Sequence, residues 1–471
     1  MTAVALATTL TLAEVLAGTG GVLAPDHARS GGQVLSGVSI DSRTIRPGEL
    51  FVAIRGPRFD GHDFVAPAAR GGAAAALVHR DVDAPAELPL VRVEHTTRAL
   101  GALAHHVRRQ ATSPVVGITG SVGKTTTKDL AAGLLETRGP VLRTAGNLNN
   151  EYGLPLTLLG LREEHTAAVL EMGMSAPGEL RTLSAIAEPD VAVITRVAPV
   201  HLEFFPSVDA IADAKAEILE GLRPGGTAVL NGDDPRLRRL GEGWDGRVVW
   251  FGRDRRHDVS AERWRGTVFG MRFDLRIEGR TVDVGLPLAG PHFVEDFLAA
   301  AAAAHVLGVT SEAMAEAAAS LAPARHRGEV RQLAEGVTLI DDSYNSSPEA
   351  LEASVVALTL APARRRVAVL GDMLELGATA PELHRESGRT LAGRVDVVAG
   401  VGPLAKEIVA GAREAGLDEK ALVHFDDATL AAAAVGELVQ PGDAVLVKAS
   451  RGIQLERVVT AIAARFGGGE A

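Results

Sequence analysis

A glycine turn that carries a lysine and a hydroxyl is the stretch of this sequence best suited to chemistry. It reads Thr-Gly-Ser-Val-Gly-Lys-Thr over residues 119–125 and lies between a β-branched run and a segment with helical spacing. The backbone N–H groups of such a turn attract phosphate, Lys124 neutralises its outer charge, and the Thr125 hydroxyl can bind Mg2+. The alternative is a solvated lysine beside an ordinary turn. The spacing is shorter than in the common P-loop, because Ile118 stands where that motif has its first glycine.

Three residues further along the chain could complete a phosphate and metal site. Glu171 and His201 each follow a β-branched run, and ligands of parallel sheets gather at the carboxyl ends of strands. Lys215 lies on the apolar face of a helix predicted over residues 208–222, which Ser207 can cap. A lysine is costly to bury unless it is paired or chemically altered. The alternative interpretations are loop residues for the first two and a lysine that snorkels to solvent for the third.

Polar clusters elsewhere suit substrates rather than metals. The loop at 147–150 is rich in amides, and residues 41–43, Asp-Ser-Arg, could bind a diphosphate or a sugar. In the last third of the chain, polar groups follow three predicted strands, at 341–345, 371–373 and 448–451. By composition alone, each of these clusters could equally be an ordinary turn.

Composition excludes several classes of function. The 471 residues carry a net charge of −11 and no cysteine. The negative charge argues against nucleic-acid binding, and the missing thiols exclude disulfides, thiolate metal sites and a cysteine nucleophile. The N-terminal region has no basic residue before Arg29, and the longest apolar run, at 297–309, is too short to span a bilayer. We therefore expect a soluble cytoplasmic protein without a signal peptide or membrane insertion.

The elements that must position these residues form three α/β units, which we place at 1–111, 112–323 and 324–471. The middle unit alternates β-branched runs with helical segments, as a mostly parallel sheet covered by helices does. Within it, predicted strands at 267–274 and 281–288 alternate apolar and polar residues, which is typical of antiparallel pairs. The last unit repeats the alternating scheme and predicts a second doubly wound sheet.

Taken in order, these motifs resemble the Mur ligases of peptidoglycan synthesis over nearly the whole chain. The shortened glycine spacing at 119–125 is similar to that family's phosphate loop. The stretches at 146–155, 171–173, 342–348 and 371–377 resemble the family members that join D-alanyl-D-alanine to UDP-N-acetylmuramoyl-tripeptide. The resemblance implies a UDP-binding N-terminal domain, a central ATPase and a Rossmann-like C-terminal domain. It also implies a monomer whose partners are these two small substrates.

The resemblance further implies an ATP-dependent amide ligase that works through an acyl phosphate. Its nucleotide site would comprise Gly120, Ser121, Val122, Gly123, Lys124, Thr125, Thr126, Asp296, Arg327 and Asn345. Two Mg2+ ions would be held by Thr125, Glu171, His201 and Lys215, the last as a carbamate formed with CO2. The substrates would be contacted by Ser42, Arg43, Asn147, Asn149, Asn150, Lys448, Ser450 and Arg451. The catalytic residues would be Lys124, Lys215 and His201.

The sequence departs from the family pattern at three positions. Arg196 stands where the family often has Asn, and Phe293 and Asp296 replace the two amides of an H-N-x-x-N stretch. An ionised Asp accepts but cannot donate a hydrogen bond, so the nucleotide contact at Asp296 changes character. These departures leave open a nucleotide-binding scaffold without catalysis. A ligase of the same superfamily with another acceptor, such as an earlier Mur step or a folylpolyglutamate synthase, is the other alternative.

Overall fold

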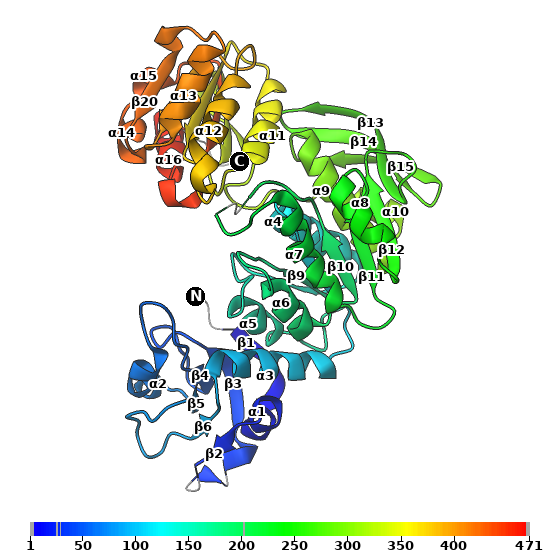
Figure 1. The fold of residues 1–471 in the computed structure, drawn as a ribbon, viewed down its shortest axis with the longest axis vertical. Helices are drawn as coiled ribbons and strands as arrows, with labels where there is room; N and C mark the ends of the chain where they lie inside the picture. The colour runs from blue at the N-terminus through cyan, green and yellow to red at the C-terminus, as the bar shows by residue number, and fades with distance from the viewer. Residues whose placement is uncertain (1–3, 25–26, 29, 201–202, 468–471) are drawn as a thin grey trace.

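The computed structural model describes residues 4–24, 27–28, 30–200 and 203–467. These residues form three lobes along the long axis of the molecule, and each lobe is built on its own sheet (Figure 1). The predicted α/β class with three units is confirmed, and so is the mostly parallel sheet of the middle one, whereas the predicted boundaries at 111/112 and 323/324 stay a prediction. No helix within the described ranges is long and apolar enough to cross a membrane.

The N-terminal lobe has a six-stranded sheet of order β1-β3-β4-β5-β6-β2, in which only the two outer pairs are antiparallel. Its strands are β1 Val4–Thr11, β2 Val22–Leu23, β3 Val34–Ser39, β4 Glu49–Val52, β5 Ala75–Val78 and β6 Leu90–Arg92. Its helices are α1 Leu12–Thr19, α2 Val65–Arg70 and α3 Thr96–Gln110. Thr11 and Glu14 form a capping box, which starts α1 directly after β1.

Helix α3 joins this lobe to the middle one through a buried arginine. The Arg108 side chain is 1% exposed. It donates to the carbonyl of Ala187 at 2.9 Å and pairs with Asp190 at 2.8 Å, both in the middle lobe. Because a buried guanidinium is costly without partners, these bonds fix the relative position of the two lobes.

The middle lobe has a nine-stranded sheet of order β15-β14-β13-β12-β11-β10-β7-β9-β8. Its strands are β7 Val115–Thr119, β8 Val141–Arg143, β9 Ala167–Glu171, β10 Val191–Ile194, β11 Thr227–Asn231, β12 Arg247–Gly252, β13 Val259–Thr267, β14 Gly270–Ile277 and β15 Arg280–Leu286. Its helices are α4 Lys124–Leu135, α5 Gly153–Leu158, α6 Glu179–Ala187, α7 Val208–Glu220, α8 Pro235–Glu242, α9 Pro291–Val306 and α10 Ser311–Ala318. The alanine run of α9 is fully buried, as a helix in the interior of a core requires.

The sequence prediction of one strand over residues 267–274 is wrong. Those residues contain the turn between β13 and β14, at Val268 and Phe269, and the two strands pair antiparallel on either side of it. The turn is apolar because Val268 is fully buried in an apolar cluster of the C-terminal lobe, which also contains Ile340 and Leu351. The alternation of apolar and polar residues therefore continues through the turn, because the turn packs against another lobe, and it gave the false appearance of one strand.

The C-terminal lobe has a six-stranded sheet of order β16-β17-β21-β18-β19-β20, antiparallel only at β16–β17. Its strands are β16 Glu329–Gln332, β17 Thr338–Asp342, β18 Arg365–Gly371, β19 Val397–Val401, β20 Leu422–Phe425 and β21 Asp443–Lys448. Its helices are α11 Pro348–Thr359, α12 Ala380–Arg389, α13 Ala405–Glu414, α14 Ala428–Ala433, α15 Val435–Leu438 and α16 Glu456–Arg465. Two apolar clusters on opposite faces of the sheet form its core, as in a doubly wound domain.

Candidate active site

The predicted phosphate loop connects β7 to α4 and depends on two glycines. Gly123 caps α4 with a φ of 84°, and Gly120 has a φ of 154°. A Cβ atom on Gly120 would collide with the Thr195 hydroxyl, and one on Gly123 would collide with the Asp296 carboxylate. Only glycine fits at either place, so the backbone of the loop lies close to its neighbours at the N-terminus of α4.

The loop is fixed to the segment that follows β10. The Thr195 hydroxyl donates to the carbonyl of Val122 at 2.6 Å, and the Ser121 N–H donates to the carbonyl of Arg196 at 2.7 Å. The Ser121 hydroxyl and the Ala198 backbone are hydrogen-bonded as well, at 2.9 to 3.0 Å. These contacts hold the loop in its shape before any phosphate is bound.

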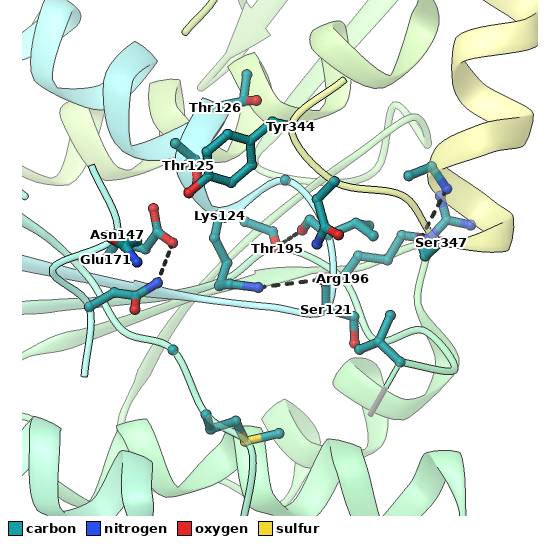
Figure 2. Close-up of a pocket in the computed structure, with 18 of the residues that line it drawn as sticks. Ser121, Lys124, Thr125, Thr126, Asn147, Glu171, Thr195, Arg196, Tyr344 and Ser347 are labelled. Carbon is teal, nitrogen blue, oxygen red and sulfur yellow. Dashed lines mark hydrogen bonds between the residues drawn. The ribbon is translucent and has the colours of Figure 1, made fainter. Parts of the chain in front are cut away.

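Lys124 points back onto its own loop, as Figure 2 shows. Its Nζ donates to the carbonyls of Gly120 at 2.7 Å and Ser121 at 3.3 Å. Burial lowers the pKa of Lys124, while the carboxylates of Glu171 and Glu375 oppose that change. The side chain of Lys124 is therefore held by the carbonyls of its own loop, and the charges of Glu171 and Glu375 partly offset the effect of its burial.

Glu171 is the last residue of β9, and only one of its two carboxylate oxygens has a hydrogen-bond partner. The Asn149 side-chain amide donates to Oε1 at 2.7 Å, whereas Oε2 is buried and has no hydrogen-bond partner. A buried carboxylate oxygen without a partner is costly, and a divalent cation is a partner that would remove the cost. Asn149 thus contacts the predicted metal ligand, and the neighbouring Asn150 accepts from the backbone of Gly153 and shapes the turn.

Lys215 lies on the apolar face of α7, where the spacing of apolar residues places it, and it is buried there instead of snorkelling to solvent. Its side chain is 2% exposed. Burial and the nearby Lys124 lower the pKa of Lys215 well below its ordinary value, so the uncharged amine is favoured. His201, the other predicted metal ligand after β10, lies outside the described residues.

The C-terminal lobe supplies a second wall with a buried ion pair. Lys448 is 3% exposed, and its Nζ donates to Asp342 at 2.6 Å and to the carbonyl of Asn345 at 3.0 Å. Ser450 is also buried and accepts from the Leu374 N–H at 2.9 Å. Both predicted substrate contacts therefore make internal bonds that join the ends of β17, β18 and β21.

Aromatic and cationic groups cover the same wall. The Arg327 guanidinium lies 4.1 Å from the centre of the Tyr344 ring, and the Arg451 guanidinium lies 5.8 Å from it. Both distances are within the range of cation–π attraction. Arg451 also pairs with Glu456 at 3.2 Å and remains 57% exposed, so it is available to an anion.

Asp296 and His292 are the buried ionisable groups that α9 contributes. Burial, and next the neighbouring Glu295, raise the pKa of Asp296 well above its ordinary value. Burial also lowers the pKa of His292 to about 4. Both groups are thus biased toward their neutral forms, and a neutral Asp296 can donate as well as accept a hydrogen bond.

One cluster with the spacing of metal ligands lies apart from Glu171. Among the described residues, His326, Glu329 and Asp341 bring one ligand atom each within 4.8 Å of one another. His326 Nδ1 is 2.7 Å from Asp341, and Glu329 accepts the His326 N–H at 2.8 Å. Arg331 lies near both carboxylates, so hydrogen bonds and charge pairing already account for this group.

A cavity of about 920 Å³ lies between the middle and C-terminal lobes and collects most of the predicted site. The predicted residues that line it are Ser121, Val122, Gly123, Lys124, Thr125, Thr126, Asn147, Asn149, Asn150, Glu171, Asp296, Arg327, Asn345, Lys448, Ser450 and Arg451. Gly120 and Lys215 are not among the residues that line it. Ser42 and Arg43 are not part of it, and Arg43 is 85% exposed and paired with Asp41 after β3.

Several lining residues were not predicted as site residues. Arg196 lies 3.6 Å from Glu295 and 3.7 Å from Glu349, and it thus links the middle lobe to α11 of the C-terminal lobe. Glu375, in the segment after β18, also lines the cavity. The sequence signal for Glu375 was its place in the 371–377 stretch, but nothing local indicates that it lines a cavity with residues of another lobe.

The fold and the cavity define a three-lobed α/β protein with a phosphate loop that faces the C-terminal lobe. Three family models match the chain in order: "Mur ligase family, catalytic domain" over residues 34–108, "Mur ligase middle domain" over 118–304, and "Mur ligase, glutamate ligase domain" over 326–451. The chain belongs to the Mur ligase family, and it is an ATP-dependent enzyme that forms amide bonds.

Individual relatives show which members of the Mur ligase family this chain resembles. The Escherichia coli (strain K12) protein "UDP-N-acetylmuramoyl-tripeptide--D-alanyl-D-alanine ligase" is 39% identical over 433 residues, which cover 91% of this chain and 94% of the relative. The crystal structure of MurF from Acinetobacter baumannii superposes with a TM-score of 0.89 at 32% identity, covering 98% and 99% of the two chains. The MurF ligase from Thermotoga maritima in complex with ADP gives a TM-score of 0.82 at 34% identity, with coverage of 91% and 97%.

Proposed function

We propose that this chain joins D-alanyl-D-alanine to UDP-N-acetylmuramoyl-tripeptide, with ATP converted to ADP and phosphate, in peptidoglycan precursor synthesis. The observation that carries the proposal is the cavity between two lobes, which holds the phosphate loop on one wall and polar groups of the C-terminal lobe on the other. The 39% identity to a ligase of this specificity over nearly the full length of both chains supports the choice of substrates.

The residues around Glu171 fit Mg2+. The buried, unpartnered Oε2 of Glu171 and the Thr125 hydroxyl are the hard oxygen donors that this ion prefers. We infer that these two residues, with His201 and Lys215, hold two ions, which supply positive charge for phosphoryl transfer when bound. Burial favours the uncharged amine of Lys215, the form that reacts with CO2, so a carbamate is compatible with its site.

The roles of the remaining residues follow from the reaction. A peptide carboxylate is a poor electrophile, so it must first become an acyl phosphate. Lys124 and the loop backbone offset the charge of the transferring phosphoryl group, and Arg327 and Asn345 lie where they can contact the nucleotide from the other wall. The cavity limits access of water to the acyl phosphate, which would otherwise hydrolyse.

The N-terminal lobe would bind the UDP end of the substrate. Ser42 and Arg43 follow β3 at a carboxyl edge of a mostly parallel sheet, where ligands of such sheets bind. Asn147, Asn149 and Asn150 line the cavity and would contact the muramoyl-peptide. We further infer that the protein binds no nucleic acid, since its net charge is −11. From its resemblance to the Mur ligases we also infer a cytoplasmic monomer.

Phosphate release measured with each substrate alone and with both together tests this function. We expect release that requires UDP-N-acetylmuramoyl-tripeptide and D-alanyl-D-alanine together, in a one-to-one ratio with the pentapeptide product detected by mass spectrometry. ATP turnover without peptide product would contradict it. Product formation with glutamate or a diamino acid in place of the dipeptide would instead indicate the ligase with another acceptor.

A further inference from the structure

The chain enters the C-terminal lobe through a turn that carries Arg327, one of the residues that line the cavity. This turn lies between α10 and β16 and is fixed on both sides of the arginine. His326, which precedes Arg327, is bonded within the C-terminal lobe. Gly328, which follows Arg327, packs against the middle lobe. The arginine is therefore held between contacts with both lobes.

Three polar groups of His326 take part in hydrogen bonds. Its N–H donates to the Glu329 carboxylate at 2.8 Å, and its carbonyl accepts from the Tyr344 N–H at 3.1 Å. Its Nδ1 lies 2.7 Å from Oδ2 of Asp341, whose side chain is fully buried. Since an ionised carboxylate only accepts hydrogen bonds, Nδ1 carries the proton of this bond. The three bonds tie the turn to β16, to β17 and to the segment that follows β17.

These bonds hold His326 in a backbone conformation that a histidine rarely adopts. Its φ is 62°, in the left-handed region, where a residue with a Cβ atom is strained. The turn directs the imidazole of His326 to β17, while the next side chain, that of Arg327, lines the cavity. A strained backbone persists only where the surrounding contacts maintain it, and the imidazole supplies one of those contacts.

Gly328 fixes the other side of Arg327. Its N–H donates to the carbonyl of Asp341 at 2.9 Å, and its φ is 76°. A Cβ atom on Gly328 would lie 2.8 Å from the ring of Phe293 on α9, so the backbone of the turn packs directly against the middle lobe. Phe293 replaces an amide of the family pattern, and in this chain its ring supports the turn.

The same bonds place the aromatic partner of Arg327. The Arg327 guanidinium lies 4.1 Å from the centre of the Tyr344 ring, within the range of cation–π attraction. Oδ1 of Asp341 accepts from the N–H of Ser343 at 3.2 Å and from its hydroxyl at 2.7 Å, directly before Tyr344. The pair of His326 and Asp341 thus joins the turn that carries the guanidinium to the segment that carries the ring.

We propose that His326 is a positioning residue for the nucleotide: its bond to Asp341 fixes the turn that holds the Arg327 guanidinium beside Tyr344, where it contacts a phosphate of ATP. This inference rests on the proposed function, in which Arg327 contacts the nucleotide. A long flexible side chain loses conformational freedom when it binds an anion. A fixed turn and a neighbouring ring remove part of that cost before binding, so loss of the imidazole should weaken nucleotide binding through Arg327.

Three variants of the full-length protein isolate the imidazole. Glycine adopts a φ of 62° without strain, so His326→Gly removes the hydrogen bond to Asp341 and leaves the backbone conformation allowed. Asparagine tolerates the left-handed region, and its side-chain amide is a donor, so His326→Asn is the conservative variant. Glu335→Gly is the matched control, because Glu335 has a similar φ of 56° in the same lobe, is exposed and does not line the cavity.

Equilibrium binding of the non-hydrolysable analogue AMP-PNP with Mg2+ measures the effect without either peptide substrate. We expect His326→Gly to raise the Kd about tenfold, as for the weakening of one hydrogen bond to a charged group. His326→Asn should recover part of this loss, and Glu335→Gly should match the wild type. In the ligation assay, His326→Gly should raise the KM for ATP and leave the KM for UDP-N-acetylmuramoyl-tripeptide unchanged.

A double-mutant cycle with Arg327→Ala separates positioning from a general structural role. We expect Arg327→Ala to raise the Kd at least as much as His326→Gly, and the two changes together to raise it no further than Arg327→Ala alone. A structural role would instead weaken binding by the same factor in both backgrounds, and that result overturns the proposal. Wild-type affinity in His326→Gly or in Arg327→Ala, or an equal loss of affinity in Glu335→Gly, also overturns it.

The proposed function can fail separately, because the binding experiment contains neither the UDP substrate nor the dipeptide. If the variants bind AMP-PNP as expected but the wild type forms no product with D-alanyl-D-alanine, the choice of acceptor is wrong and the positioning role of His326 stands.

Discussion

Replacing Lys215 by Met should stabilise the middle lobe while abolishing ligation. The lysine is 2% exposed, and burial together with Lys124 lowers its pKa well below the ordinary value. Met has nearly the same length and volume, so the substitution leaves no large cavity. The variant removes an amine that is costly to bury and, if Lys215 carries the carbamate, also removes a metal ligand.

The gain in the free energy of unfolding from Lys215→Met has one part that is the same at every pH and one part that depends on pH. Burying a polar group without full compensation costs about 1–3 kcal/mol, and this part should appear at every pH. Since the folded pKa lies below the unfolded one, the folded protein binds fewer protons, and the wild type loses stability as pH falls between the two values. Within that window the advantage of Lys215→Met should grow by about 1.4 kcal/mol per pH unit.

Tryptophan fluorescence during urea unfolding can measure this, because all three tryptophans lie in the middle lobe, at Trp244, Trp250 and Trp264. The experiment uses CO2-depleted buffer without Mg2+ at several pH values. Lys128→Met is the matched control: Lys128 is also buried, but it donates to the carbonyl of Thr144 at 2.9 Å, so its loss should destabilise. If Lys215→Met destabilises as much as Lys128→Met, or shows no pH-dependent difference from wild type, the reasoning is refuted.

Three further substitutions test the loop and the contact between lobes. Asp296→Asn should raise the free energy of unfolding at pH 7 by roughly 1–3 kcal/mol. Burial raises the pKa of Asp296 in the folded protein, so the wild type loses stability as the pH rises above 3.8, and the variant does not. Urea midpoints that are the same for wild type and variant at pH 5 and 8 would contradict this. Arg196→Ala should raise the KM for ATP by less than about fivefold, and the difference should vanish in high salt, because its pairing with Glu349 is partly exposed; a salt-independent effect would exclude an electrostatic link. Gly225 has a φ of 81°, similar to that of Gly123, but open space around it, so Gly225→Ala should destabilise by only roughly 1 kcal/mol. Gly123→Ala should destabilise by clearly more, because the added methyl group would collide with Asp296. Equal losses of stability would mean that this collision is unimportant.

The parallel sheets were predictable because their strands are buried on both faces and so appear as continuous apolar runs. The strands at Val115–Thr119, Val191–Ile194 and Thr227–Asn231 are examples. The turn at Val268 was not predictable, because its apolar character comes from contact with another lobe. Local periodicity cannot distinguish a residue that faces its own core from one that fills a distant one.

The candidate active site likewise has parts that the sequence predicts and parts that it cannot predict. The phosphate loop could be predicted because its parts are contiguous. The place of Lys215 on the apolar face of its helix could also be predicted, but spacing alone does not distinguish a buried lysine from one that snorkels to solvent. The pairing of Lys448 with Asp342 joins residues more than a hundred positions apart, and no local pattern indicates it. The substrate contact that the resemblance implies for Lys448 stays a prediction, and the structure adds that this residue holds two strand ends together.

The buried tip of the β13–β14 hairpin limits how the C-terminal lobe can move. Two of its attachments to the middle lobe are the chain that enters it and, separately, Val268, which is buried in the same apolar cluster as Ile340 and Leu351. A rigid body held at two points keeps one freedom, rotation about the line that joins them. Any hinge motion that preserves these two attachments must therefore rotate the C-terminal wall of the cavity about the line that joins them.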